Sequence, residues 1–190
     1  RWCIWADCGH ARDGSGSRAP LAFAMSIFDS IGEDGVFFSR KDPDELLGTY
    51  SDHSILLDEA HWPTVEHYFQ AMQFVKPQNQ TRIQAVPSAG AAAKAARWAW
   101  LSGRRKDWKQ TRIAFMTRGV YIKCKSYPDV EAALLDTGDA RLVENSQYDY
   151  FWGCGRDKRG HNHYGEMLMR IRTRLREERN GESGDQPSDH

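Results

Sequence analysis

The chain has 190 residues with 26 basic and 26 acidic side chains, so its formal net charge is zero, and 40% of its residues are hydrophobic. This length and composition fit one globular domain with a single core, and they exclude disorder throughout. The charge balance excludes a globally basic nucleic-acid or membrane binder, and the short apolar runs fall far below the about 20 residues of a membrane helix.

The zero net charge conceals blocks of opposite sign. Residues 25–66 hold ten acidic and two basic side chains, whereas residues 97–125 hold nine basic side chains and one acidic one. Residues 129–149 are again acidic, and residues 156–179 are again basic. Two interpretations stay open: the blocks neutralise each other's fields within one domain, or they form a basic wall that attracts an anionic substrate.

Both ends of the chain differ from its middle. Residues 1–24 include the linker-like GSGSRAP, and we expect a poorly ordered N-terminal extension or tag there. Residues 180–190 contain no apolar side chain, so we expect a disordered tail. A single domain is then expected over residues 25–179. Because no signal peptide is recognisable, we expect an intracellular protein, cytoplasmic or nuclear.

The cysteines and histidines do not predict a metal site. Cys3 and Cys8 lie near His10, but no second pair at finger-like spacing completes four ligands. Nothing in the pattern requires disulfides, which favours a reducing compartment. No HExxH-like ligand spacing is present either.

The expected secondary structure is mainly helical. The strand candidates are residues 36–38 and 54–57, and the first expected helix is amphipathic, with Pro63 in its first turn. Trp98 and Trp100 are expected in the core. The fold class is therefore α+β, mainly α-helical with a small β-sheet. The expected helices cover residues 62–75, 87–101, 107–122, 128–136, 139–145 and 167–175.

The segment WPTVEHYFQAMQF, residues 62–74, carries one set of candidate functional groups. Glu66 falls in the first helical turn, where the helix dipole favours an ionised carboxylate, and it shares a polar stripe with Gln70 and Gln73. A carboxylate beside aromatic side chains can stabilise an oxocarbenium-like centre or activate water. The alternative is that Glu66 only stabilises the helix. His67 fits a structural hydrogen-bonding role better than a catalytic one.

The segment of residues 144–168 carries a second set. Asp149 and Trp152 precede a glycine-containing run of donors, which includes Arg156, Lys158 and Asn162. Basic donors ahead of a helix suit a phosphate, and an aromatic face suits a base or a sugar. Neither GxGxxG nor GxxxxGK[ST] is present, so no Rossmann site or P-loop is predicted. The residues alone thus predict a helical domain with a nucleotide site.

Five motifs resemble, in order, those of the NADAR (YbiA-like) family. WPTVEHYFQAMQF is similar to the family's WPTsEHYfQAqKF, and AAAKAARWAW to its A(K/R)xxGR segment. KDWKQTRIAFM and LLDTGDARLVENSQYDYFWGCG resemble the next two motifs, and RGHNHYGEMLMRIRTRL resembles the closing one. The resemblance implies a YbiA-like fold.

The resemblance also implies a hydrolase, namely an N-glycosidase that cleaves the C1′–N bond of an ADP-ribosylated base. The preferred substrate is ADP-ribosylated guanine in DNA, and the alternative is a phosphoribosylamino-pyrimidine intermediate of riboflavin synthesis. It implies Glu66 and Asp149 as catalytic carboxylates. No cofactor, metal or membrane partner is implied, and DNA is a further candidate partner. The implied substrate-binding residues are Trp62, His67, Gln73, Lys94, Arg97, Arg105, Trp108, Trp152 and Asn162.

Several residues depart from the family's pattern. Gln73 replaces a lysine, Thr49 replaces an asparagine, Ala96 replaces a glycine, and Cys154 occupies the variable position of WGxG. These departures keep a second class open, a non-catalytic ADP-ribose or nucleotide-binding module, and a third, an interaction domain without a ligand. The preference for DNA rests on the basic residues 97–125 and on the arginine-rich last helix.

Overall fold

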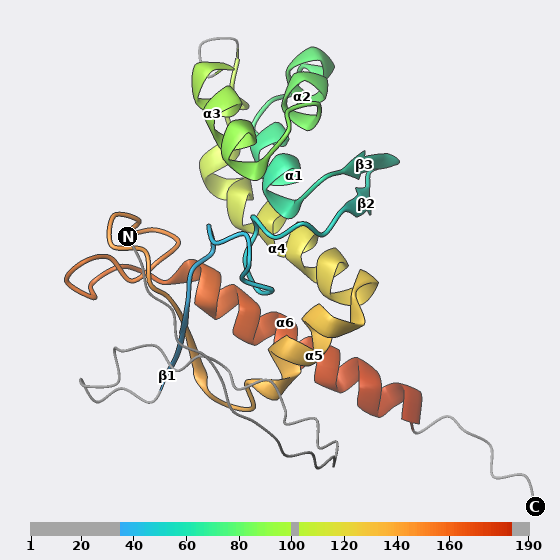
Figure 1. Ribbon diagram of the computed structural model, residues 1–190, viewed down its shortest axis with the longest axis vertical. Coiled ribbons are helices and arrows are strands. Elements are labelled where there is room, and N and C mark those ends of the chain that lie inside the picture. The colour runs from blue at the N-terminus through green and yellow to red at the C-terminus, as the bar shows by residue number, and fades with distance from the viewer. Residues whose placement is uncertain (1–34, 100–102, 184–190) are drawn as a thin grey trace, which may run out of the picture. The chain divides into compact units, whose positions relative to one another are not determined.

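The computed structural model describes residues 35–99 and 103–183 (Figure 1). The expected N-terminal extension, Trp100 and residues 184–190 lie outside these ranges. The α+β fold class predicted from the sequence is confirmed, because helices dominate and the strands are few and short. The elements are β1 (Gly35–Phe38), β2 (Ile55–Leu57), β3 (Ala60–Trp62), α1 (Val65–Ala71), α2 (Pro77–Gln84), α3 (Ala89–Ala99), α4 (Trp108–Ser126), α5 (Pro128–Asp136), β4 (Arg141–Glu144) and α6 (His163–Ser183).

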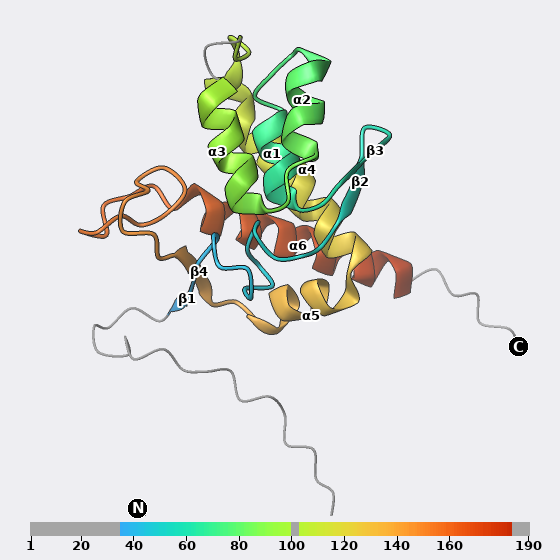
Figure 2. The same ribbon diagram turned by 45° about the horizontal axis from the view of Figure 1, so that its top comes forward.

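The described strands form two separate pairs. β1 and β4 are parallel, in a register that places Phe38 opposite Glu144. β2 and β3 form an antiparallel hairpin, whose turn residues Asp58 and Glu59 both have positive φ. This hairpin leads directly into α1, and the parallel pair places the start of the described chain beside the segment that precedes α6 (Figure 2).

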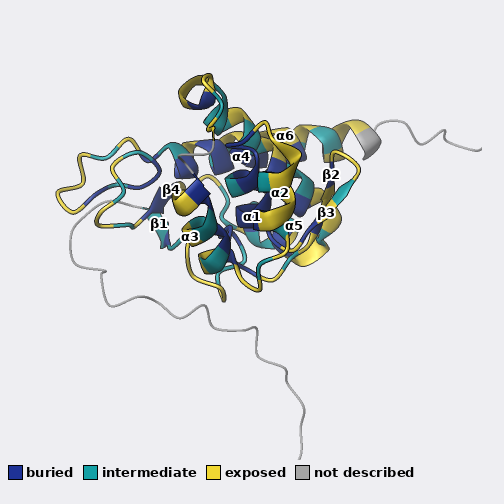
Figure 3. Cartoon of the chain, turned by 90° about the horizontal axis from the view of Figure 1, so that it is seen from above, coloured by how far each residue is buried: buried dark blue, intermediate teal, exposed yellow. Residues whose placement is uncertain are grey.

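Helix α1 is the centre of the core. It packs against α2, α3 and α4, while α6 packs against α4 and β4 (Figure 3). Six of its seven residues are buried, so the polar face of the amphipathic helix expected from the sequence is buried as well. The close approach of α4 requires Gly119, because a Cβ there would lie 3.1 Å from the side chains of Val65 and Tyr68. Because α1 is buried, its polar side chain Glu66 lies inside the protein.

Two sequence expectations about helices are corrected. Residues 139–145 do not form a helix: Arg141–Glu144 is the strand β4, since its backbone pairs with β1 and its Leu142 and Val143 side chains are both buried. The helix expected over residues 62–75 begins only at Val65. Thr64 is its N-cap, accepting a hydrogen bond from the His67 amide, so Pro63 precedes the helix.

Helix α2 and strand β3 were not predicted, because residues 77–84 are mostly polar and β3 has only three residues. At the C-terminus, α6 continues to Ser183, so the segment expected as a disordered tail is helical over residues 180–183. Trp98 is 74% exposed, which corrects its expected place in the core. Within the described ranges, no helix has the length and apolar character needed to cross a membrane.

Candidate active site

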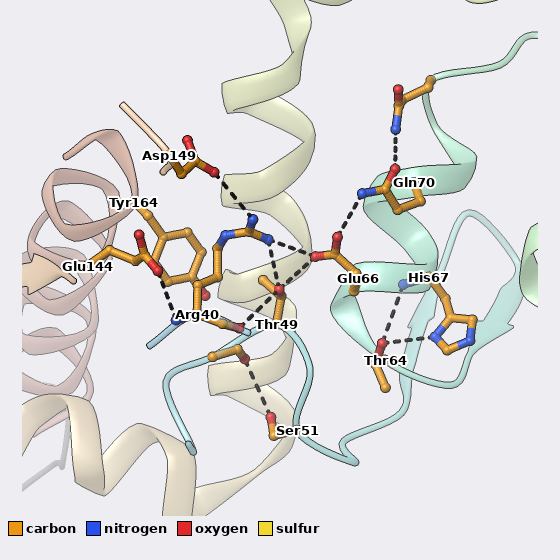
Figure 4. A network of polar contacts seen from close by, with 12 residues as sticks. Arg40, Thr49, Ser51, Thr64, Glu66, His67, Gln70, Glu144, Asp149 and Tyr164 are labelled. Carbon is orange, nitrogen blue, oxygen red and sulfur yellow. Dashed lines mark hydrogen bonds and ion pairs between the residues drawn. The ribbon is translucent and has the colours of Figure 1, made fainter. Parts of the chain in front are cut away.

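The Glu66 carboxylate lies at the centre of a buried group of hydrogen-bond donors (Figure 4). Its Oε2 accepts from Arg40 Nη1 at 2.9 Å and from the Thr49 hydroxyl at 2.7 Å. Its Oε1 accepts from Gln70 Nε2 at 2.7 Å. Three donors converge on the carboxylate, and one of them is a cation, an arrangement that suits its ionised form. The sequence placed Glu66 in a first helical turn, and in the structure this turn of α1 holds the carboxylate inside the protein.

The predicted polar stripe, which starts on α1 and ends two residues beyond it at Gln73, is a chain of hydrogen bonds. Gln73 Nε2 donates to Gln70 Oε1, and Gln70 in turn donates to Glu66. Gln73 is buried, whereas Gln70 is half-buried. The residue that replaces the family's lysine therefore supplies a donor to Gln70, which in turn donates to Glu66. The replacement for the family's asparagine, Thr49, also donates to this carboxylate.

Arg40 joins Glu66 to the second predicted carboxylate, Asp149. Besides its bond to Glu66, its Nη2 lies 3.8 Å from Asp149 Oδ2. Burial opposes the charge of Arg40, but Glu66, Tyr164 and the neighbouring carboxylates outweigh burial and raise its pKa. Its Nε is buried without a hydrogen-bond partner in the described structure. Sequence reasoning missed Arg40, although it is one of only two basic residues in the acidic block 25–66.

Asp149 and Glu144 come from β4 and the loop that follows it. Asp149 Oδ1 accepts from the amides of Phe151 at 3.1 Å and Trp152 at 2.8 Å, which leaves Oδ2 directed toward Arg40. Glu144 accepts from the Arg40 amide at 3.3 Å, and burial raises its pKa. Arg40 thus lies among three carboxylates, those of Glu66, Asp149 and Glu144, and the charge of Arg112 also acts on Asp149. Sequence reasoning did not single out Glu144.

The three tryptophans predicted to contact substrate are buried. Trp152 makes edge contacts with Phe69, Phe151 and Tyr164 at ring-centroid distances of 5.6, 4.9 and 6.4 Å. Trp108 packs against Phe69 at 5.0 Å. Trp62 donates its indole N–H to the Leu57 carbonyl at 3.1 Å. None of these tryptophans is more than 7% exposed, so they are core residues and do not form an open stacking surface.

The side chains of His67 and Asn162, which the sequence suggested as substrate contacts, both have hydrogen-bond partners within the protein. The His67 ring nitrogens contact the Thr64 hydroxyl at 2.9 Å and the Val86 carbonyl at 3.1 Å, and burial lowers the pKa of the ring. Asn162 donates to the Leu142 carbonyl and accepts from the Glu144 amide, at 2.8 and 2.9 Å. Its side chain thus holds β4 against the start of α6.

The predicted basic substrate contacts lie at the periphery. Lys94 and Arg97 are exposed on α3. Arg97 acts on Tyr50, whose pKa is raised to about 12 by burial and then by Glu66, with Arg40 and Arg97 working in the opposite direction. Arg105 instead forms a two-bond pair with Asp107, at 2.7 and 3.0 Å. Of the three, Arg97 alone is linked by charge to the surroundings of Glu66.

The arginines of α6 are largely engaged within the protein. Arg172 Nη1 donates to the Thr137 hydroxyl at 2.6 Å and the Ala140 carbonyl at 3.0 Å. Arg176 pairs with Asp139 at 2.6 Å. Arg174 and Arg179 pair with Glu178 and Glu131 at 2.8 and 3.0 Å. These pairs favour mutual neutralisation of the charge blocks, and they remove one argument for DNA binding. In the described part of the chain, no three His, Cys, Asp or Glu residues are grouped so as to hold a metal.

Comparison with known proteins places this geometry in a family. The NADAR domain matches residues 28–176. An N-glycosidase from Nostoc punctiforme is 37% identical over 142 residues, which cover 74% of this chain and 91% of that protein. N-glycosidase YbiA from Escherichia coli strain K12 is 32% identical over 139 residues, covering 73% and 86%. The chain therefore belongs to the NADAR family.

Two further comparisons bear on fold and substrate. The NMR structure of E. coli YbiA superposes with a TM-score of 0.69 at 30% identity, covering 80% of this chain and 92% of that one. This confirms the YbiA-like fold. The chloroplastic riboflavin biosynthesis protein PYRR of Zea mays is 35% identical over 153 residues, which span 73% of this chain but only 25% of that longer protein. The relatives of this chain thus include proteins named for N-glycosidase activity and for riboflavin biosynthesis.

Proposed function

We propose that this chain is an N-glycosidase that hydrolyses the bond between C1′ of a ribose and the nitrogen of a base-like amine. The observation that carries the proposal is the buried Glu66 carboxylate, which shares Arg40 with Asp149. Relatives named N-glycosidase, which match this chain over most of their length, support the same reaction class.

The chemistry follows from the charge of the site. In the reaction, the C1′–N bond breaks and its electron pair leaves with the nitrogen, so positive charge develops at C1′. Water oxygen then bonds to C1′, one water proton is lost from that oxygen, and the departing nitrogen takes up a proton. The carboxylates around Arg40 stabilise the developing cation, with Glu66 as the buried carboxylate.

Asp149 suits the proton transfers better than Glu66 does. Its side chain is 22% exposed, whereas Glu66 is 1% exposed with both carboxylate oxygens engaged. We assign Glu66 to electrostatic stabilisation and Asp149 to accepting the proton of the attacking water. Arg40 holds Glu66 in place and lies 3.8 Å from Asp149.

The substrate we propose is an ADP-ribosylated guanine, in DNA or as a smaller fragment. Exposed cations on α3, in the segment before α4 and at the start of α4 support a phosphate-bearing ligand; they are Lys94, Arg97, Arg104, Lys106 and Lys109. The second candidate is a phosphoribosylamino-pyrimidine of riboflavin synthesis, which the similarity to the maize protein favours.

The test is a paired hydrolysis assay on both substrates with Glu66→Gln as the inactive variant. We expect release of free ADP-ribose from modified guanine, and a loss of about 100-fold or more in Glu66→Gln. Glu166→Gln, an exposed carboxylate on α6, is the matched control and should keep full activity. Turnover of the pyrimidine alone would reassign the substrate. Binding of ADP-ribose without any hydrolysis would leave a non-catalytic binding module.

A further inference from the structure

Lys123 is a buried cation that the reaction described above does not use. It lies on α4 with 2% exposure. Its Nζ donates to the Leu46 carbonyl at 2.6 Å, to the Gly48 carbonyl at 2.8 Å and to the Ser51 hydroxyl. All three acceptors belong to one segment, residues 46–51, which we call the 46–51 loop. The three protons of the ammonium group are thereby matched by three acceptors.

Burying this ammonium group costs free energy, because water solvates it better than the interior does. Burial accordingly lowers the pKa of Lys123 to about 8. An apolar side chain could fill the same space without this cost. An apolar side chain could not, however, form the hydrogen bonds to the 46–51 loop.

The 46–51 loop places Thr49 beside the Glu66 carboxylate. The Gly48 carbonyl held by Lys123 and the Thr49 amide belong to the same peptide group, and that amide donates to the Arg40 carbonyl at 2.9 Å. The peptide is therefore held from both sides. The turn there is so tight that a Cβ on Gly48 would lie 2.9 Å from the Arg40 carbonyl oxygen. Beyond this peptide, the Thr49 side chain donates to Glu66.

We propose that Lys123 is a positioning residue for the active site, which fixes the Gly48–Thr49 peptide so that the Thr49 hydroxyl holds Glu66 in its working orientation. The link runs from α4 through one peptide group to the carboxylate. The kinetic consequence rests on the proposed N-glycosidase function, whereas the structural link does not.

Amide hydrogen exchange tests the structural link without any activity measurement. In Lys123→Met we expect the Thr49 amide to exchange about tenfold faster relative to the Leu168 amide in the core of α6. Arg172→Met is the matched control, because it removes another buried cation that binds a turn, and it should leave the Thr49 amide unchanged. If Lys123→Met does not fold, Lys123→Gln should show a smaller increase. Unchanged Thr49 exchange in a folded variant would overturn the proposal.

Kinetics test whether the link serves the reaction. We expect Lys123→Met to lower kcat about tenfold with little change in KM, because the charge of Glu66 is needed most in the transition state. Combined with Thr49→Val, it should cause little further loss, since both substitutions break one linkage. If the double variant instead lost the product of the two single-variant losses in kcat, the proposal would be overturned. If wild type hydrolyses neither substrate, the proposed function fails, and the exchange experiment still decides the role of Lys123.

Discussion

Thr49 and Glu66 are joined by two hydrogen bonds that run in opposite directions. The Thr49 hydroxyl donates to Glu66 Oε2 at 2.7 Å, and the Glu66 amide donates to the Thr49 carbonyl at 3.1 Å. The second bond satisfies an amide of the first helical turn, which has no partner within α1. The 46–51 loop therefore fixes both the backbone and the carboxylate of Glu66.

This reciprocal pair predicts the effect of substitutions at Thr49. Thr49→Val keeps the shape of the side chain but removes the hydroxyl donor, so we expect kcat to fall about tenfold. Thr49→Ser keeps the donor and should stay close to wild type. The measurement is steady-state hydrolysis of the preferred substrate. Equal activity of the valine and serine variants would show that the hydroxyl is dispensable.

Arg40 is predicted to be essential for stability as well as for activity. Arg40→Met leaves two carboxylates, Glu66 and Asp149, near each other without the cation between them. We expect a loss of about 3 to 5 kcal/mol in the free energy of unfolding, measured by urea denaturation. Adding Glu66→Met should restore part of this loss, because it removes the unpaired buried charge. Arg97→Met, on the exposed face of α3, should change stability by less than about 0.5 kcal/mol.

Gln73 already supplies the donor that the hydrogen-bond chain to Glu66 requires. We therefore expect Gln73→Lys to keep turnover within about threefold of wild type, and Gln73→Leu to lower it about tenfold, because leucine leaves Gln70 Oε1 without its donor. Both variants are compared in the same hydrolysis assay. A large gain in Gln73→Lys would contradict this expectation and show that the chemistry needs a positive charge at this position.

Asp149 combines a backbone contact with a charge, and two variants separate them. Asp149→Asn keeps an oxygen that can accept from the Phe151 and Trp152 amides but removes the charge. We expect a stable protein with kcat reduced about 100-fold. Asp149→Ala should in addition lose about 1 to 3 kcal/mol of stability, because two amides lose their acceptor. Thermal unfolding and turnover are measured together, and full activity in the asparagine variant would exclude a role for the charge.

The lowered pKa of Lys123 predicts a pH dependence of stability. Between pH about 8 and 10.5 the unfolded chain keeps the Lys123 proton while the folded chain has released it. The unfolded state then binds more protons, so the free energy of unfolding contributed by this group rises with pH. Cys124 acts oppositely, because burial raises its pKa to about 12. The measurement is the free energy of unfolding in urea across this pH range. The value for wild type minus the value for Lys123→Met should rise with pH, and this difference separates the contribution of Lys123 from that of Cys124.

The sequence predicted the helical class and the acidic centre of the site, because both depend on local patterns. The stripe of Glu66, Gln70 and Gln73 follows from helical spacing, and its members do bond in series. Arg40 could not be found in this way, since its meeting with Glu66 depends on how the 46–51 loop folds back over α1. Nor could spacing show that the His67 ring and the Asn162 amide are occupied by partners within the protein.

The wrong helix at residues 139–145 has the same cause. A short run with three apolar residues fits a helix turn or a buried strand equally well, and only a distant partner decides between them. That partner is β1, about a hundred residues earlier. Helix α2 was missed because its single buried residue, Ile83, leaves no apolar periodicity to detect.

The parallel pairing of β1 with β4 also governs when the site can form during folding. Arg40 follows β1 and Glu144 ends β4, and the bond between them spans 104 residues. Closing so long a segment carries an entropic cost that local helices do not have, and non-local contacts of this kind slow folding. The helices can form early, but the arginine that joins the carboxylates reaches its place only once both strands have met. Catalytic competence should therefore appear in refolding experiments after the helical signal has recovered.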